Sequence, residues 1–528
     1  MKLARMSCHA ILAMALTTGQ IGFSNTPTPG GSLVFGRGGD SVSLDPAAAT
    51  DGESFNVTAH IYNTLVTFKP GTTDIVPDLA KSWDVSKDGL TYTFKLQEGV
   101  KFHDGETLDA EAVVFSFMRQ KDTKHPAYAY SGPYVNFASL GFPDLIKSIE
   151  AVDKATVKFT LAQPNATFLA SLGIPSFAIV SPKAVLEKKK DFRRNPVGSG
   201  PFVFQKWKEK EAIILKANPA YWGPKPHLES VVFRSIPDNT SRMMELMAQK
   251  IHVMDNPSPS DLETIQKRLG TGVSFVKQPG FNVSYLSMNN LKKPFDNVKV
   301  RQAISHAVNK EAIVKAVFRN YGKVAKTPMP PTLWGYNDNV EDYSYDLKKA
   351  KDLLTEAGYP NGFETTLWAM PVSRPYMPDG RKVAEAIQGD LAKIGVKAKI
   401  MSYDWGTYLD KVQAGEHDMA LLGWTGDIGD PDNFLYVLMD KDNTTKPAQN
   451  ISFYRSDELH EVLIAARKAS DQNTRAELYK KAQIIIHKDA PLVPIAHSIE
   501  VVPTLSKIQG FTMDPTGRRN FSASWIQK

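Results

Sequence analysis

The chain contains 528 residues, of which 42% are hydrophobic and 23% are charged. This length is roughly three times that of a usual single domain, so two or more hydrophobic cores are expected. The composition excludes a disordered, collagen-like or coiled-coil protein, because each of those classes needs a strong bias that is absent here. The sequence has no uninterrupted apolar run of about twenty residues, and no bilayer-spanning helix is predicted.

The basic residues do not gather into a nucleic-acid site. The formal net charge is +7, from 63 Lys and Arg against 56 Asp and Glu. The densest basic run, residues 188–194, offers no interleaved aromatic platform for stacking bases and is followed by Pro196. We therefore interpret this run as a solvated loop and predict no nucleic-acid partner.

The first 24 residues are typical of a secretory signal peptide. Lys2 and Arg5 precede a short apolar stretch at residues 10–16, and small residues suitable for cleavage lie near position 24. Cleavage there would lower the net charge from +7 to +5. Cys8, the one cysteine, precedes the apolar stretch, which argues against a lipid anchor. An exported mature chain would then contain no disulfide, no thiol nucleophile and no cysteine-ligated metal.

The first half of the chain is predicted to be rich in strands. Residues 25–31 form an unstructured lead-in, and a short strand begins at residues 33–35. Apolar and polar residues alternate at 91–96 and again at 157–161, a pattern typical of half-buried strands. Residues 32 to about 275 are therefore predicted to form strands separated by Pro and Gly turns.

Past about residue 280 the pattern changes to helices that alternate with strands. The spacing of apolar residues and the capping residues predict helices at 300–308, 309–317, 347–357 and 383–394, and strands at 365–368, 396–400 and 419–422. Such alternation predicts an α/β lobe with a central sheet.

The usual catalytic motifs are missing from the sequence. There is no GxSxG, HExxH or P-loop pattern, and no GxGxxG opens a helix. The acidic run 427–432 could suggest calcium, but an EF-hand needs Gly and Glu where this chain has Asp432 and Leu438. Scattered histidines such as His103 and His497 have no companion at ligand spacing. We predict no metal and no cofactor; an exported hydrolase is a distant alternative without an identifiable catalytic pair.

Polar and aromatic residues follow the predicted strands of the second half at their carboxyl ends. They are Arg374 and Tyr376 after the strand at 365–368, Trp405 after the strand at 396–400, and Thr425, Gly426 and Asp427 after the strand that begins at 419. In open α/β sheets ligands bind outside the carboxyl ends of strands, so one cleft is expected here. Taken singly, Asp427 could close a turn, Arg374 could form a surface ion pair, and the aromatics could be core residues.

Several segments resemble the signature of the bacterial extracellular solute-binding proteins, family 5, which are the binding components of ABC importers. The segments are residues 77–83, 88–94, 100–105 and 195–202. The resemblance extends from about residue 32 to the C-terminus. Within the family it is closest to the dipeptide-binding members, on the segments 367–376 and 423–434.

The resemblance implies an α/β, two-lobe periplasmic-binding-protein fold (type II, cluster C) with an extra subdomain in the first lobe. It predicts a first lobe at 32–279, completed by 499–528, and a second lobe at 280–498. The chain would cross the hinge near 278–282 and return near 496–500. It further implies a periplasmic, monomeric, non-enzymatic protein that delivers dipeptides or short peptides to ABC transporter permease subunits at the inner membrane.

The resemblance also implies a set of ligand-binding residues: Asp427, Arg374, Trp405, Tyr376, Thr425, Gly426 and Tyr134. Asp427 would pair with the α-ammonium group of the ligand and Arg374 with its carboxylate. Trp405 and Tyr376 would flank the ligand, while Thr425 and Gly426 would offer backbone groups. Tyr134 would contribute from the first lobe.

A dipeptide fits such a pair of fixed charges. Its two charged ends are at most roughly 7 Å apart, and a planar guanidinium binds both oxygens of a carboxylate. A longer peptide or a blocked terminus would leave a buried charge unpaired, which is costly. Longer peptides, haem and glutathione remain as alternative ligands. A neutral solute is disfavoured, because it would leave the charges of Asp427 and Arg374 without ionic partners.

Overall fold

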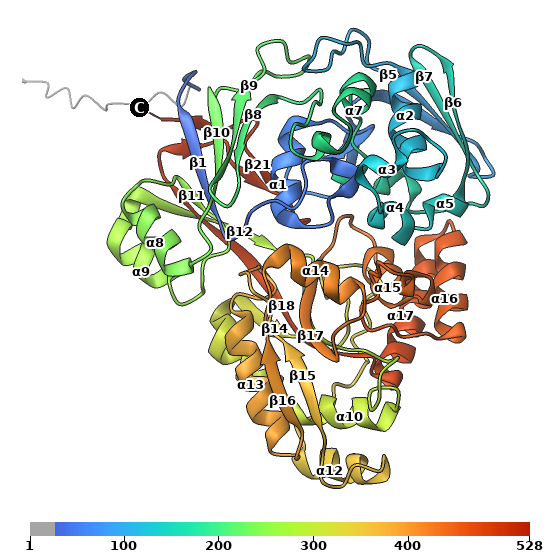
Figure 1. Ribbon diagram of the computed structural model, residues 1–528, viewed down its shortest axis with the longest axis vertical. Coiled ribbons are helices and arrows are strands. Elements are labelled where there is room, and N and C mark those ends of the chain that lie inside the picture. Colours follow the sequence, from blue (N-terminus) through green and yellow to red (C-terminus); the bar gives the residue numbers. More distant parts are fainter. Residues whose placement is uncertain (1–26, 528) are drawn as a thin grey trace, which may run out of the picture.

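The computed structural model describes residues 27–527, so the predicted signal peptide at residues 1–24 lies outside the described part. Figure 1 shows two lobes, one above the other, with the long strand β18 (Leu492–Leu505) running diagonally between them. No helix within residues 27–527 is long and apolar enough to cross a membrane.

The first lobe is built on a mixed sheet. Its strands, in spatial order, are β8 (Phe202–Lys208), β9 (Ala212–Ala217), β10 (Ser230–Ser235), β1 (Ser32–Arg37) and β11 (Val253–Met254), followed by the C-terminal half of β18 with β12 (Val273–Pro279) on it. Phe35 of β1 contacts the rings of Phe233 and Phe521, and His60 of α1 (Gly52–Ile61) stacks on Phe521. This aromatic cluster fixes α1 on the sheet, and the N-terminus of α1 lies at the cavity described below.

A second sheet forms the extra subdomain of the first lobe. It is antiparallel, in the order β4 (Ala80–Val85), β5 (Thr91–Leu96), β7 (Thr156–Leu161) and β6 (Ile146–Asp153). The strands predicted at 91–96 and 157–161 are confirmed as β5 and β7. Phe94 and Phe159 meet edge to face at 5.7 Å, and Phe117 of α2 (Ala110–Lys121) packs on Phe159 at 5.1 Å.

Helices are more frequent in the first lobe than the sequence analysis predicted. Besides α1 and α2 they are α3 (Tyr128–Ser131), α4 (Val135–Ser139), α5 (Phe142–Leu145), α6 (Phe168–Ser171), α7 (Pro182–Lys188), α8 (Asn239–Met247) and α9 (Leu262–Leu269). Most of them are two turns or shorter, and so few residues give a weak helical period.

Within this lobe, α2 is anchored by a fully buried ion pair. Arg119 donates from Nη1 and Nη2 to the two carboxylate oxygens of Asp45, at 2.8 and 2.6 Å. Burial alone would raise the pKa of Asp45, yet Arg119 holds it below its ordinary value. Removing one partner of such a pair leaves the other charge buried without compensation.

We therefore expect Asp45→Asn to lower the free energy of unfolding by about 3–5 kcal/mol, measured by urea denaturation followed by circular dichroism. The matched control is Asp352→Asn, which breaks the exposed Lys348–Asp352 pair on the surface of α12 (Leu347–Glu356). That substitution should lower the free energy of unfolding by less than about 0.5 kcal/mol. Equal, small effects of both substitutions would contradict the structural role given to the buried pair.

The second lobe is the predicted α/β unit. Its strands, in spatial order, are β16 (Lys397–Met401), β15 (Glu364–Trp368), β17 (Met419–Thr425), β13 (Asn282–Met288) and the N-terminal half of β18, with β14 (Gly322–Val324) also on β18. Around them lie α10 (Val298–Ala307), α11 (Lys310–Ile313), α12, α13 (Gly380–Ala392), α14 (Trp405–Gln413), α15 (Asp432–Met439), α16 (Asp457–Lys468) and α17 (Gln472–Asp489).

The predicted helices and strands of this lobe are confirmed to within a few residues, with one exception. The single helix predicted at 309–317 is α11, which ends at Ile313 and continues as a wider, π-helical turn over Val314–Phe318. Asn309 caps α11 as predicted, because its side chain accepts the N–H of Ala312 at 3.0 Å. The apolar spacing alone did not separate the two kinds of turn.

Two strands carry the chain between the lobes. β12 pairs with Ile499–Leu505 of β18, whereas β13 pairs with the preceding residues Leu492–Ala496. At this crossing the Asn282 side chain accepts the N–H of Ser498 at 2.9 Å and donates to its carbonyl at 3.1 Å. Asn282 therefore ties the two crossing segments to each other. The predicted lobe boundaries at 279/280 and 498/499 stay predictions.

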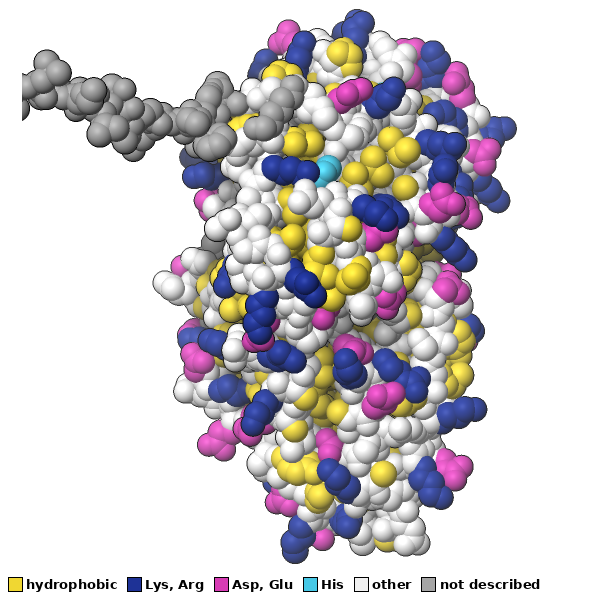
Figure 2. All heavy atoms as spheres, turned by 90° about the vertical axis from the view of Figure 1, so that its left-hand side faces the viewer, with side chains coloured by type: hydrophobic (Ala, Val, Ile, Leu, Met, Phe, Trp, Pro, Cys, Tyr) yellow, Lys and Arg dark blue, Asp and Glu magenta, His cyan; other side chains and the backbone are white. Residues whose placement is uncertain are grey.

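The surface carries both charges, interspersed. Figure 2 shows Lys and Arg beside Asp and Glu over the whole visible face, with no stripe of one sign. The basic run 188–194 is mostly exposed, as predicted, but it is not an irregular loop. It continues α7 as a 3-10 turn over Lys189–Arg193, anchored by the buried ring of Phe192.

Candidate functional site

A cavity of about 130 Å³ lies between the two lobes. Five of the seven predicted ligand-binding residues line it: Arg374, Tyr376, Trp405, Thr425 and Asp427. From the first lobe come the N-terminus of α1, Glu500 of β18 and the segment 516–519. Figure 1 shows α14 and α15 of the second lobe along the side that faces the first lobe.

Strand direction explains why the second-lobe residues meet. β15 runs parallel to β16 and to β17, so the carboxyl ends of the three strands lie at the same edge of the sheet. Arg374 follows β15, Trp405 begins the helix after β16, and Asp427 follows β17. The cleft expected from the order of strands and polar residues is therefore present.

Asp427 presents an acidic group without a cationic partner. Its backbone N–H donates to Asn433 Oδ1 at 2.7 Å, and the indole of Trp424 donates to the same oxygen at 3.0 Å. Within residues 27–527, no Lys, Arg or His nitrogen lies within 4 Å of its carboxylate. Burial raises the pKa of Asp427 to about 6, opposed by the more distant Arg518 and by Asn433. A cationic ligand group would compensate this carboxylate.

Arg374 presents an unused hydrogen-bond donor. It is buried, and its Nη1 donates to Glu53 Oε1 across the cleft at 2.9 Å. Its guanidinium carbon lies 4.8 Å from the centre of the Trp405 ring. Burial alone would lower the pKa of Arg374, but Glu53 raises it above the ordinary value. Nη2 is buried without a partner among the described residues and is therefore suited to an anionic group.

The aromatic residues fit tightly around these charges. The Tyr376 ring lies against β17 at Gly423, where a Cβ would come within 2.2 Å of Tyr376 Cδ2, so only glycine permits this approach. Burial raises the pKa of Tyr376 to about 12, and its phenol is neutral at physiological pH. Trp405 is the first residue of α14, which Asp404 caps, and its indole N–H is buried without an acceptor in the described chain.

Three residues of the first-lobe wall form a buried charge triad: Asp255, Arg519 and Glu500. Arg519 Nε donates to Asp255 Oδ1 at 2.9 Å, and its Nη1 donates to Glu500 Oε2 at 2.8 Å. The sequence pattern predicted neither this triad nor Glu53. The four residues come from segments that lie far apart in the chain, so no spacing signal connects them.

The comparisons with known proteins identify the family of this chain. The family model of the bacterial extracellular solute-binding proteins, family 5 Middle, matches residues 74–446. The chain belongs to this family. It is 43% identical over 505 residues to the dipeptide-binding protein of Escherichia coli, covering 93% of this chain and 94% of that protein. It is 42% identical over 489 residues to heme-binding protein A of Haemophilus influenzae, covering 90% and 89%.

The solved structures extend the similarity to the whole fold of this family 5 protein. The periplasmic binding protein DppA from Helicobacter pylori, described as ABC transporter-associated and in complex with peptide STSA, matches with a TM-score of 0.90 and 45% identity. The match covers 95% of this chain and 99% of that chain. The predicted family and the two-lobe α/β fold of type II, cluster C, are confirmed.

Two predicted site residues of this family 5 protein do not line the cavity. The N–H of Gly426 donates to the carbonyl of Phe281 at 2.6 Å, so this N–H is already engaged, and the backbone role predicted for Gly426 stays a prediction. Tyr134 is buried within the first lobe, where its hydroxyl donates to the carbonyl of Tyr128 at 3.0 Å. The role predicted for Tyr134 at the ligand therefore stays a prediction without support from the lining of this cavity.

The acidic run 427–432 is divided between different partners. Asp430 accepts hydrogen bonds from Arg475 at 2.7 and 2.8 Å, and the buried Asp432 lies 3.4 Å from Arg467. Only Asp427 of the three faces the cavity. The run therefore joins α15 to the helices α16 and α17, and its carboxylates do not converge on one point.

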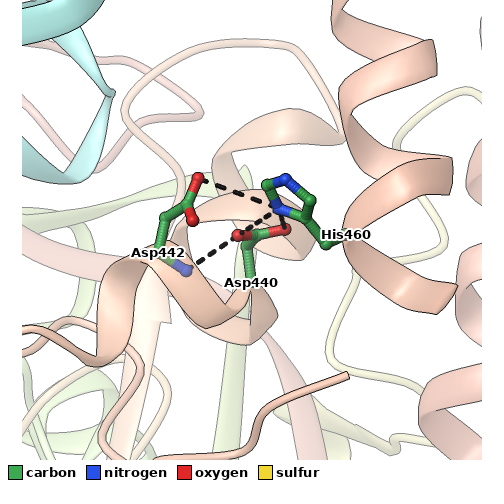
Figure 3. Close-up of side chains that lie close together, drawn as sticks. All are labelled: Asp440, Asp442 and His460. Carbon is green, nitrogen blue, oxygen red and sulfur yellow. Dashed lines mark hydrogen bonds and ion pairs between the residues drawn. The ribbon is translucent and has the colours of Figure 1, made fainter. Parts of the chain in front are cut away.

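One group of side chains in the described part has the composition of a metal site. Figure 3 shows Asp440, Asp442 and His460, whose candidate ligand atoms lie within 4.8 Å of one another. His460 Nδ1 lies 3.0 Å from Asp440 Oδ1, the Asp442 N–H donates to that same oxygen, and Tyr436 donates to Asp442. These bonds already explain the cluster as the connection between the ends of α15 and α16.

Proposed function

We propose that this protein is a periplasmic, non-enzymatic receptor that captures dipeptides or short peptides between its lobes and delivers them to an ABC transporter. One observation carries the proposal: a single cavity holds an acidic group without a cationic partner, Asp427, and a guanidinium with a free donor, Arg374. A zwitterionic ligand supplies the missing partner of each. Neither group requires the ligand to react.

In this proposal the α-ammonium group binds the Asp427 carboxylate and the α-carboxylate binds Arg374 Nη2. Asn433 accepts the backbone N–H of Asp427 and fixes the loop, while the charge of the carboxylate has no cationic partner among the described residues and is left for the ligand. Glu53 holds Arg374 by Nη1 and leaves Nη2 without a partner among the described residues. Both charged groups of the ligand are then paired, which removes the main cost of burying them.

Contacts between the lobes explain how a captured ligand is sensed. Besides Arg374 and Glu53, Ser373 donates to the carbonyl of Asn256 at 3.2 Å, and Gln449 donates to Asn136 at 3.1 Å. These bonds exist only while the lobes are together. A ligand that contacts both walls favours the closed state, and the permease subunits distinguish that state from the open one.

The comparisons support a peptide ligand over the alternatives. Relatives that cover most of the chain are named dipeptide-binding proteins, and the Helicobacter pylori structure contains the peptide STSA. The similarity to heme-binding protein A keeps haem as a competitor. However, the residues that line the described cavity include no His, Cys or Met, and its two tyrosines, Tyr285 and Tyr376, which are the other residue type able to bind haem iron, are both buried. Export through residues 1–24 and a monomeric state belong to the same proposal.

Peptide affinity should depend on pH through Asp427. In the empty protein its pKa is about 6, so below pH 6 the carboxyl group carries a proton that must leave before it can pair with an ammonium group. Affinity should therefore fall about tenfold for each pH unit below 6 and stay level from pH 6 to about 7.5. Calorimetric titrations between pH 4.5 and 7.5 measure this.

The same titrations with Asp427→Asn isolate the contribution of this residue. Burial also raises the pKa of Glu53 and of Glu500, so a residual slope in the variant would belong to them. A pH profile of the wild type that is flat, or one that the variant reproduces, would contradict the assignment of Asp427.

A competition experiment tests the proposed ligand class. The protein without residues 1–24, refolded to remove bound ligand, is mixed with equimolar Ala-Ala, STSA, glutathione and haem, and the bound fraction is identified by mass spectrometry. The proposal predicts intact peptide in the bound fraction. Haem or glutathione alone in that fraction would overturn it, and cleaved peptide would show an exported hydrolase instead.

A further inference from the structure

The triad of Asp255, Arg519 and Glu500 lacks one partner. Its single cation lies between two carboxylates, and all three side chains are at most 3% exposed. The triad therefore carries a formal charge of −1 within the wall of the cavity. The buried Arg242, which donates to the carbonyl of Asp255 at 3.2 Å, offsets this charge on the Asp255 side. On the Glu500 side an uncompensated buried charge would cost several kcal/mol, so a further cation or a proton is expected there.

The missing partner is needed at one particular atom. Both oxygens of Asp255 are bound, Oδ1 to Arg519 and Oδ2 to the amide of Asn256 at 2.9 Å. Glu500 accepts from Arg519 with Oε2 only. Its Oε1 is buried and has no hydrogen-bond partner among the described residues, and Glu500 is one of the residues that line the cavity.

Gly517 lies beside Glu500 Oε1 where the first lobe meets the second. Gly517, at a φ of +75°, separates Glu500 from Thr425 of the second lobe, and a Cβ on it would lie 3.6 Å from Glu500 Oε1 and 3.1 Å from Thr425 Cγ2. A side chain at residue 517 would fill the narrow space between Glu500 Oε1 and Thr425, and glycine leaves that space free. The hydroxyl oxygen of Thr516, also buried and without a partner, lies on the same stretch of the cavity wall.

The lining of the cavity is acidic overall. Five lining residues are acidic and two are basic: Asp51, Glu53, Asp255, Asp427 and Glu500 against Arg374 and Arg519. A zwitterionic dipeptide has no net charge and leaves this excess unchanged.

The other acidic groups of the lining are already engaged. Asp51 caps α1 by accepting the N–H groups of Glu53 and Ser54, Glu53 is paired with Arg374, and Asp427 is assigned to the α-ammonium group. Behind the wall, Arg37 pairs with Asp40 and donates to the carbonyl of Glu53. Glu53 Oε2 is also buried without a hydrogen-bond partner among the described residues, but Arg37 lies 3.7 Å from it. Glu500 is therefore the acidic residue that we assign to a second cation.

We propose that Glu500 Oε1 binds the cationic side chain of the captured peptide, so that the cleft prefers dipeptides that contain Lys or Arg. This inference rests on the proposed function and adds a specificity-determining residue to it. A neutral side chain leaves Glu500 unpaired, and an acidic side chain adds repulsion in a water-poor site. The Thr516 hydroxyl can accept a second hydrogen bond from the same ammonium group.

Wild-type titrations test the preference. Ala-Lys and Lys-Ala are compared with the analogues that contain norleucine or glutamate at the same position, and Ala-Ala is the reference. In at least one of the two residue orders, the lysine peptide should bind at least about tenfold more tightly than the norleucine peptide. The glutamate peptide should bind more weakly than the norleucine peptide. Equal affinities of the lysine and norleucine peptides in both orders would overturn the inference. Failure of Ala-Ala to bind would instead contradict the proposed function.

Variants assign the preference to Glu500. Glu500→Gln should reduce the lysine-to-norleucine ratio to less than about twofold. The matched control is Asp255→Asn, which also removes one negative charge from the triad, but at a residue whose two oxygens are both hydrogen-bonded. This variant should keep most of the lysine-to-norleucine affinity ratio. If Glu500→Gln fails to fold, Glu500→Asp retracts the carboxylate by one methylene and should reduce the ratio. A preference that survives the change at Glu500, or is lost equally in Asp255→Asn, would overturn the role of Glu500.

Discussion

Asp427→Asn is expected to weaken the binding of a free dipeptide by at least about 2 kcal/mol, or roughly 30-fold. The substitution keeps the shape of the side chain and removes the charge that pairs with the α-ammonium group. The loop should keep its conformation, because its bond to Asn433 comes from the backbone N–H of residue 427. Calorimetric titration measures the loss.

The same variant should be more stable than the wild type when empty. Burial raises the pKa of Asp427 to about 6, so at pH 7.5 the folded protein holds a carboxylate that would be better solvated in the unfolded chain. Removing this charge should raise the midpoint temperature of unfolding while dipeptide binding is lost. Such opposite effects on stability and function are expected at a functional site. A lower midpoint together with unchanged binding would indicate a purely structural role for Asp427.

Arg374→Gln should have two separable effects. The first is a loss of dipeptide affinity of at least about 2 kcal/mol, since the free donor for the ligand carboxylate disappears. The second is a loss of stability, because Glu53 is left buried with Arg37, 3.7 Å away, as its nearest cation. Titration and urea unfolding measure the two effects on the same protein.

The double variant Arg374→Gln with Glu53→Gln separates the two effects. Removing the charge of Glu53 should restore most of the stability, since no buried carboxylate then lacks a partner. Binding of the free dipeptide should not recover, because no cation faces the ligand carboxylate. A double variant that binds as the wild type does would show that Arg374 acts only as the partner of Glu53.

The local sequence pattern predicted much of the second lobe correctly. The apolar spacing at 383–394 and 396–400 identified α13 and β16, and residues at the carboxyl ends of β15, β16 and β17 meet in one cavity. This worked because parallel strands end at the same edge of a sheet, so position in the sequence implies position in space. The family resemblance then connected Arg374 and Asp427 with one ligand.

The remaining features depend on contacts between distant segments. Glu53, Asp255, Glu500 and Arg519 reach the cavity from four separate parts of the first lobe, which no spacing along the chain connects. The N–H of Gly426 donates to the carbonyl of Phe281 at the crossing between the lobes, a pairing that is set by tertiary structure and that no local pattern predicts.

The most direct test of the account is a calorimetric titration of the refolded wild-type protein with Ala-Ala, N-acetyl-Ala-Ala and Ala-Ala amide. We expect the free dipeptide to bind and each blocked form to bind at least about 30-fold more weakly. Blocking either end removes the charged group that pairs with Asp427 or with Arg374. Equal affinity for all three peptides would contradict the central claim that this cleft recognises the two charged ends of a short peptide.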